Sequence, residues 1–433
     1  MPPKPDGRPG SLILAGVSVR LMAESARRAG YEVVALDAFG DRDTRQAAVA
    51  WHDIGSGQGA RLDGAWVLAM LEVLPQQRPG LQGWIAGTGF EALPEVLAQG
   101  TGLLPLLGTP PAAQAALRDP VRFFAALAAL GLPHPATQMQ RPGASAGWLY
   151  KDFGSSGGWQ VRAAGAAPVS PTPLAHYQRY APGEPMSCLF VANGLAACVL
   201  GHQHQVVAPL GGRPCVWRGV IGPVAVPAVA QVVLDRALAA LVPHFGLQGL
   251  ASLDYLLDGD TVQLLECNPR PSASMALYDG GDGPPLMAAH VHACLQGHLP
   301  RPQASQGPVR GTHLVFAGRA VTLEAGILAR LQESGWCHDV AAGPVRVGMH
   351  EPVCTVTAQA QDVAAVRRLL AARMQQVQAW LHLPRTEACK RLPLIVCTRP
   401  RSTGATRRAG AQPPWGGPAP ADTETETETE TQP

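Results

Sequence analysis

The sequence is poor in charge: charged residues make up 15% of its 433 positions, and the net charge is +2. A nearly neutral chain has no broad basic field, so the composition argues against nucleic acid and against an anionic membrane as partners. The N-terminus is polar and proline-rich, and the sequence has no run of about eighteen apolar residues. We therefore expect neither a secretory signal nor a membrane span.

Paired cysteine motifs are also missing. The nine cysteines are scattered, and none forms a C-x-x-C pair. An odd and unpatterned set fits a reducing compartment better than a disulfide scaffold, which predicts a cytoplasmic location. His202 and His204 have no neighbouring cysteine or third histidine, so they do not predict a zinc site. Residues 16–20 lack the three-glycine fingerprint of a dinucleotide site.

The chain begins with a pattern typical of a β-α-β unit. Residues 11–17 and 31–36 are apolar runs, and the stretch between them is typical of a helix. Ser18 is a plausible N-cap of that helix. Ser18 and Arg20 lie where a helix start could bind a substrate carboxylate.

Further acidic residues follow the expected strands. Residues 37–44 contain three aspartates at the edge where open α/β sheets bind ligands, with solvated turn acids as the alternative. Glu91 follows a later strand-to-helix turn and could meet a substrate ammonium.

The most informative stretch is residues 250–274, which predicts a β-hairpin turning on the sequence D-G-D. Glu266 and Asn268 are two residues apart on one strand, so their side chains share a face. With a three-residue loop, Asp254 lies opposite Leu264 on that face, diagonal to Glu266. Two carboxylates and an amide oxygen suit Mg²⁺ or Mn²⁺. The alternative is a surface hairpin with solvated acids.

Other residues suit phosphates and developing anions. Arg270 follows the hairpin and could place a guanidinium beside such a group. Lys151 closes an apolar strand before a glycine- and serine-rich loop, and a second strand is expected at residues 159–162. A lysine and exposed backbone N–H groups suit phosphate oxygens, with a surface hairpin as the alternative. The loop residues are Gly154, Ser155, Ser156, Gly157 and Gly158.

Several of these motifs resemble those of the ATP-grasp superfamily. E-C-N-P-R, residues 266–270, is similar to its metal-binding strand, and G-L-P-H-P, residues 131–135, to the turn that leads into its nucleotide-binding part. Q-R-Y-A-P-G-E, residues 178–184, resembles its adenine- and ribose-binding linker. The resemblance adds Gln178, Tyr180 and Glu184 to the nucleotide-binding residues.

The sequence departs from this family at one position. Many members place a phosphate-binding lysine at the start of a helix, where residues 119–122 read D-P-V-R. Whether Arg122 replaces that lysine stays open.

The resemblance implies a ligase that uses ATP and Mg²⁺ (or Mn²⁺) to convert a carboxylate into an acyl phosphate. An amine then attacks, and ADP and phosphate are released. Asp254, Glu266 and Asn268 would hold the metal ion, while Lys151 and Arg270 would serve catalysis. The implied partners are a small-molecule carboxylate and an amine, and a homo-oligomer is possible.

Residues 17–44 and 351–356 resemble a narrower group, the predicted ATP-dependent carboligases that include the tyramine–glutamate ligase of methanofuran biosynthesis. This likeness implies joining an amino-acid carboxylate to an amine, and the identity of both stays open. The alternatives are a biotin-carboxylase-like enzyme that activates bicarbonate and a non-catalytic ATP-binding module.

The expected fold class is α/β, with α+β character in the catalytic part. An open parallel α/β domain is expected in residues 11–108, ATP-grasp nucleotide-binding lobes in 109–302, and a C-terminal α+β lobe in 303–390. Apolar residues at helical spacing in residues 363–381 predict a core-facing helix. Residues 1–10 and 391–433 are expected to be disordered, because they have little to bury. The role of the tail and the oligomeric state stay open.

Overall fold

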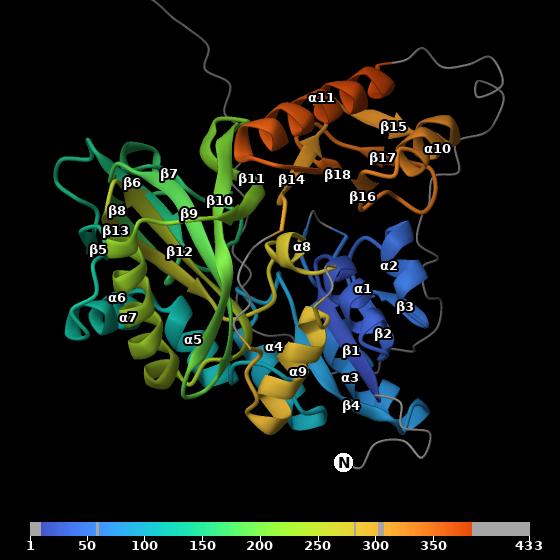
Figure 1. Cartoon of the computed structure of the whole chain (residues 1–433), viewed down its shortest axis with the longest axis horizontal. Helices are drawn as coiled ribbons and strands as arrows, with labels where there is room; N and C mark the ends of the chain where they lie inside the picture. The colour runs from blue at the N-terminus through green and yellow to red at the C-terminus, as the bar shows by residue number, and fades with distance from the viewer. Residues whose placement is uncertain (1–9, 58–59, 281–282, 302–306, 383–433) are drawn as a thin grey trace, which may run out of the picture. The chain divides into compact units, whose positions relative to one another are not determined.

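The first part of the fold is an open parallel sheet with the strand order β3-β2-β1-β4 (Figure 1). The computed structural model describes residues 10–57, 60–280, 283–301 and 307–382. Buried apolar strands alternate with helices, which is why neighbouring strands run parallel. The strands are β1 (Ser11–Gly16), β2 (Glu32–Asp37), β3 (Ala50–Asp53) and β4 (Leu81–Ala86), and the helices are α1 (Arg20–Arg28), α2 (Arg42–Ala47), α3 (Gly64–Gln77) and α4 (Pro94–Leu103).

The second part is an antiparallel sheet in the order β13-β12-β9-β10-β11-β14-β18-β16. Strands expected in two separate lobes, residues 109–302 and 303–390, therefore form one continuous sheet, because β11 pairs with β14. The first five strands of this sheet in the chain are β9 (Glu184–Asn193), β10 (Ala197–Leu210), β11 (Arg213–Val224), β12 (Gln248–Asp258) and β13 (Thr261–Asn268). The others are β14 (Val309–Phe316), β16 (Cys337–His338) and β18 (Pro352–Ala360).

Three helices pack beside this sheet: α5 (Pro111–Arg118), α6 (Pro120–Ala129) and α7 (Ala228–Phe245). By length and composition alone, α7 could cross a membrane. We interpret it as a core helix, because it contacts β10 and β13 and its buried leucines pack with Phe190 and Tyr255.

A smaller antiparallel sheet has the strand order β5-β8-β6-β7. The strand predicted at residues 159–162 is wrong in extent, because β7 covers only Arg162–Ala163. Gly157 and Gly158, with φ of 67° and 71°, turn the preceding chain toward β11, where Trp217 N donates to Gly157 O at 3.0 Å. The other elements are β5 (Thr137–Gln138), β6 (Trp148–Asp152), β8 (Ala175–Arg179) and the 3₁₀ helix Ala164–Ala166.

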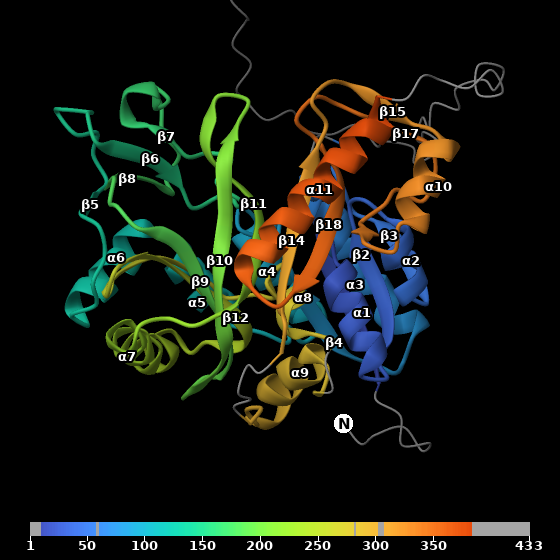
Figure 2. The same cartoon turned by 45° about the horizontal axis from the view of Figure 1, so that its top comes forward.

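The predicted C-terminal helix is confirmed as α11 (Val363–Leu381), which lies along β14 and β18 (Figure 2). Its apolar stripe faces the sheet: Val366, Leu370, Val377 and Leu381 are buried. The remaining elements come between strands of the large sheet in the sequence. They are α8 (Met275–Tyr278), α9 (Leu286–Gln296), β15 (Val321–Leu323), α10 (Ala325–Glu333) and β17 (Val345–Val347). The predicted tail, residues 391–433, lies outside the described residues.

Docking of α11 can be tested with two neighbouring leucines. Leu370→Ala should lower the free energy of unfolding by about 2–4 kcal/mol, because it leaves a cavity against the sheet. Leu369, which is 39% exposed, is the matched control, and Leu369→Ala should cost less than about 1 kcal/mol. Urea unfolding measures both, and equal losses would contradict this packing.

A buried histidine gives a pH-dependent prediction. His176 packs between Phe124 and Phe153, and in the described part of the chain neither ring nitrogen has a hydrogen-bond partner. Burial, and then the charge of Lys151, lowers the pKa of His176 to about 3. The unfolded chain therefore takes up a proton near the ordinary histidine pKa of about 6.5, whereas the folded chain does not.

The stability of the wild-type protein should accordingly fall as the pH decreases from about 6.5 toward 3. His176→Phe keeps an aromatic ring in place and removes this proton uptake. The stability of the variant relative to the wild type should rise as the pH falls, as measured by urea unfolding at pH 8 and pH 5. An unchanged difference would show that His176 is not held neutral.

Candidate active site

The β12–β13 hairpin turns on two residues, Gly259 and Asp260, instead of the predicted three. Tyr255 therefore lies opposite Leu264, and the predicted pairing of Asp254 with Leu264 is wrong. In an unbroken ladder this shorter turn would put the two acids of the hairpin on opposite faces, because side chains alternate along a strand.

A β-bulge at Leu265 returns the acids to one face. The register shifts by one residue, so that Asp254 pairs directly with Glu266. Asn268 lies two residues farther along, and its Nδ2 donates to Asp254 Oδ2 at 3.3 Å and to Glu266 Oε1 at 3.2 Å. The structure thus brings the three predicted metal ligands together, and the two acids are direct cross-strand neighbours.

The surroundings of the two carboxylates shift their pKa values in opposite directions. Burial, and then repulsion by Glu266, raises the pKa of Asp254 well above its ordinary value. Burial also acts to raise the pKa of Glu266, but the charge of Arg118 and a hydrogen bond from Asn268 hold it below its ordinary value. A divalent cation would relieve this repulsion, and the oxygen donors are those that Mg²⁺ and Mn²⁺ prefer.

Two arginines and Glu91 lie against this cluster. Arg118 ends α5, donates Nη2 to Asn268 Oδ1 at 2.6 Å, and places Nη1 3.7 Å from Glu266 Oε2. Arg270 donates Nε to Glu91 Oε1 at 2.7 Å, and Arg118 lies 4.0 Å from the same oxygen. Burial would raise the pKa of Glu91, but the two guanidinium groups lower it. Glu91 thus meets arginines of this chain where the sequence suggested a substrate ammonium.

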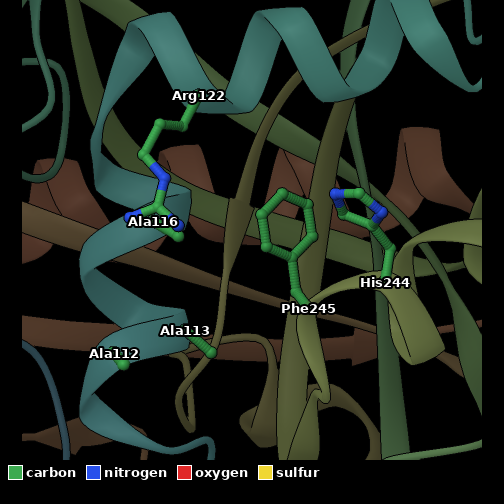
Figure 3. Close-up of a pocket in the computed structure, with 6 residues that line it drawn as sticks. All are labelled: Ala112, Ala113, Ala116, Arg122, His244 and Phe245. Carbon is green, nitrogen blue, oxygen red and sulfur yellow. The ribbon is translucent and has the colours of Figure 1, made fainter.

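Arg118 was not predicted from the sequence, in which Arg122 was the candidate. Arg122 is exposed on α6 and lines a separate pocket of about 280 Å³ with His244 and Phe245 (Figure 3). Asp119 caps the N-terminus of α6, so the preceding helix, α5, ends at Arg118. The Asp-Pro pair at residues 119–120 was the available signal, since it marks a helix start and leaves the preceding arginine at the end of another helix.

Lys151 interacts with the same cluster from the smaller sheet. It lies on β6, and its Nζ donates to Gln178 Oε1 on β8 at 2.6 Å. Burial lowers the pKa of Lys151, and the nearby carboxylates of Glu266 and Asp254 act in the opposite direction. The predicted phosphate-binding lysine therefore interacts electrostatically with two of the predicted metal ligands, Glu266 and Asp254.

The predicted phosphate loop follows Lys151. A Cβ on Gly158 would overlap the carbonyl oxygen of Cys215 on β11, so only glycine fits there. The loop is thus held between the two sheets by a close backbone contact. Its other predicted residues, Gly154, Ser155 and Ser156, are half-buried.

Two of the three predicted linker residues, Tyr180 and Glu184, are exposed, whereas Gln178 is buried. Tyr180 is 66% exposed. Glu184 begins β9 opposite Leu257 of the hairpin strand β12, and its carboxylate lies 3.2 Å from His204 Nδ1. Gln178 lies in β8, Tyr180 follows that strand and Glu184 begins β9, so the three residues span the connection from the smaller sheet to the larger one.

The residues predicted near the first helix are used differently. Val19, not Ser18, occupies the N-cap position of α1, and its side chain makes no capping bond, so the predicted Ser18 cap is wrong. Arg20 is 5% exposed, and its Nε donates to Asp339 Oδ1 at 2.6 Å. A second guanidinium nitrogen lies 3.2 Å from Glu24. Arg20 therefore joins helix α1 to the residue that follows β16, and its role toward a substrate carboxylate stays a prediction.

The aspartates of residues 37–44 also have structural contacts. Asp37 is fully buried and accepts from Trp51 Nε1 at 2.6 Å and Gly40 N at 2.8 Å. Asp41 caps α2 through Thr44 N at 2.9 Å. Neither of these two is a solvated turn acid or an open ligand site.

Comparisons with known proteins agree with this architecture. N5-carboxyaminoimidazole ribonucleotide synthetase in complex with ADP is 13% identical, with a TM-score of 0.62, over 87% of this chain and 98% of that chain. The Thermus thermophilus enzyme of that name is 18% identical, with a TM-score of 0.59, over 87% and 100%. A biotin carboxylase–ATP-analogue complex from Campylobacter jejuni is 11% identical, with a TM-score of 0.63, over 86% and 91%. No curated protein sequence matches the chain.

At these identities the likeness establishes the fold, and the expected fold class is confirmed. Residues 117–274, which include the hairpin, Lys151 and Arg118, match the sequence profile of the ATP-grasp domain. The chain thus contains an ATP-grasp domain in residues 117–274, and its fold is shared with the enzymes named above.

Proposed function

We propose that the protein is an ATP- and Mg²⁺-dependent ligase that activates a carboxylate as an acyl phosphate and joins it to an amine, releasing ADP and phosphate. The observation that carries this proposal is the convergence of Asp254, Glu266 and Asn268, with Lys151 and Arg270 beside them. Such a set can hold a triphosphate and stabilise the charge that develops on phosphoryl transfer.

The metal site follows from the oxygen donors of the hairpin. Asp254, Glu266 and Asn268 would hold the ion. Burial, and then repulsion by Glu266, raises the pKa of Asp254, and a bound cation would offset both effects. When bound, Mg²⁺ would neutralise the negative charge of the phosphates.

The other residues supply fixed positive charge and backbone donors. Lys151, oriented by Gln178, would bind phosphate oxygens together with the N–H groups of residues 154–158. Arg270 is held by Glu91 through Nε at 2.7 Å and is 13% exposed, so its guanidinium is oriented before substrate enters. It would stabilise the oxyanion of the acyl phosphate and of the tetrahedral intermediate. Tyr180 and Glu184 would contact adenine and ribose.

The substrate class rests on the narrower resemblance. We propose a small-molecule amino-acid carboxylate and an amine, as in the carboligases that include tyramine–glutamate ligase. The fold neighbours are named as a ribonucleotide synthetase and biotin carboxylases, so activation of bicarbonate is the second candidate. We expect the enzyme to act in the cytoplasm, and a homo-oligomer is compatible with this function.

A screen of ATP and Mg²⁺ with pairs of amino acids and amines tests this proposal. The expected result is ADP release that depends on both substrates, with a condensed product found by mass spectrometry. AMP as the nucleotide product would exclude an acyl phosphate. ADP release with bicarbonate alone would favour the second candidate, and ATP binding without turnover would favour a binding module.

Arg270 provides a sharper test once turnover is found. Arg270→Lys should lower kcat about a hundredfold, because lysine cannot bind Glu91 and an oxyanion through a planar fork, and KM for ATP should change much less. Arg236→Lys is the control, since Arg236 is exposed and contacts only backbone carbonyls of residues 130 and 131 among the described residues. Unchanged kcat in Arg270→Lys would contradict the assigned role.

A further inference from the structure

The side-chain amide of Asn268 points its nitrogen at the two carboxylates of the proposed metal site. Nδ2 donates to both Asp254 and Glu266. Oδ1 accepts from Arg118 at 2.6 Å and, at the longer distance of 3.5 Å, from Arg270 Nη2. This orientation follows from the partners, because a guanidinium can only donate and a carboxylate mainly accepts. Asn268 is 6% exposed, so no bulk water competes for these bonds.

This orientation is the reverse of the one that a shared cation needs. An amide nitrogen does not coordinate Mg²⁺ or Mn²⁺, whereas the amide oxygen does. For Asn268 to act with the two carboxylates, its amide must turn so that Oδ1 faces them. Nδ2 would then face Arg118, and two donors would oppose each other. The turn therefore requires Arg118 to move.

The charges of the cluster lead to the same conclusion. Three acids, Asp254, Glu266 and Glu91, lie among three bases, Lys151, Arg118 and Arg270. Of the bases, Arg118 is the one that contacts both a hairpin carboxylate, at 3.7 Å, and the amide oxygen of Asn268. Arg118 is thus the base best placed to act as a counter-cation. The guanidinium of Arg118 has a second acidic partner in Glu91, 4.0 Å away.

We propose that Arg118 is a built-in counter-cation that competes with the divalent ion for Asn268 Oδ1, so that metal binding turns the Asn268 amide and shifts Arg118 toward Glu91. The inference rests on the proposed metal site and adds a positioning residue to it. Arg118 keeps the carboxylate pair compensated before nucleotide arrives. It also makes metal binding weaker than the three ligands alone would allow.

Titration of the full chain with Mn²⁺ in the absence of nucleotide, followed by electron paramagnetic resonance, tests this competition. Arg118→Gln should bind Mn²⁺ about tenfold more tightly than the wild type, which corresponds to the loss of one charge-assisted hydrogen bond that opposes binding. Arg122→Gln is the matched control, since it removes the same charge four residues away on an exposed helix face. Its affinity should equal that of the wild type.

A second variant tests the inference if Arg118→Gln does not fold. Arg118→Lys keeps a buried positive charge but ends one atom short of the guanidinium nitrogens, so it releases Asn268 Oδ1. It should also bind Mn²⁺ more tightly than the wild type. Wild-type affinity or weaker in a folded Arg118 variant would overturn the inference while leaving the proposed function intact. No Mn²⁺ binding by any of the proteins would instead remove the metal site itself.

Discussion

Repulsion between Asp254 and Glu266 is the constraint around which the site is built. The pair lies directly across a β-ladder, and burial raises the pKa of Asp254 well above its ordinary value. Two carboxylates placed this closely need a proton, a cation or strong donors between them. Asn268, Arg118 and Lys151 supply donors and positive charge from three different segments of the chain.

The fold explains how these segments meet. Strand β9 pairs with β12 along the full length of β9, and this pairing fixes the position of the hairpin in the large sheet. Helix α5 contacts β13 and brings Arg118 to the end of that strand. The smaller sheet brings Lys151, and its loop returns to β11 through Gly157 and Gly158. The rigid sheets thus position side chains that sequence separation would leave far apart.

Part of this arrangement could be predicted from the local sequence pattern. The alternation of Glu266 and Asn268 predicted their shared face, and the apolar spacing of residues 363–381 predicted the packing of α11. Both signals depend only on the period of a strand or a helix. The fold class followed from motifs that resemble those of the ATP-grasp superfamily, and these motifs lie within residues 117–274, which match the ATP-grasp domain.

Other features depend on long-range contacts that no local pattern records. The two-residue turn and the bulge at Leu265 compensate each other, and neither could be read from apolar alternation alone. Arg118 meets Asn268 across 150 residues of sequence, and Arg20 meets Asp339 across 319. An arginine at a helix end has the same local sequence whether it faces solvent or a buried carboxylate, so the role of each became visible only in the folded chain.

The proposed reaction depends on the hairpin binding a divalent ion against a nucleotide. Diffraction at the manganese absorption edge, from crystals grown with Mn²⁺ and a non-hydrolysable ATP analogue, measures this directly. We expect an anomalous peak within coordination distance of oxygen atoms of Asp254, Glu266 and Asn268 and in contact with the analogue's phosphates. A bound analogue with no peak at these three residues, or with manganese held elsewhere, would contradict it.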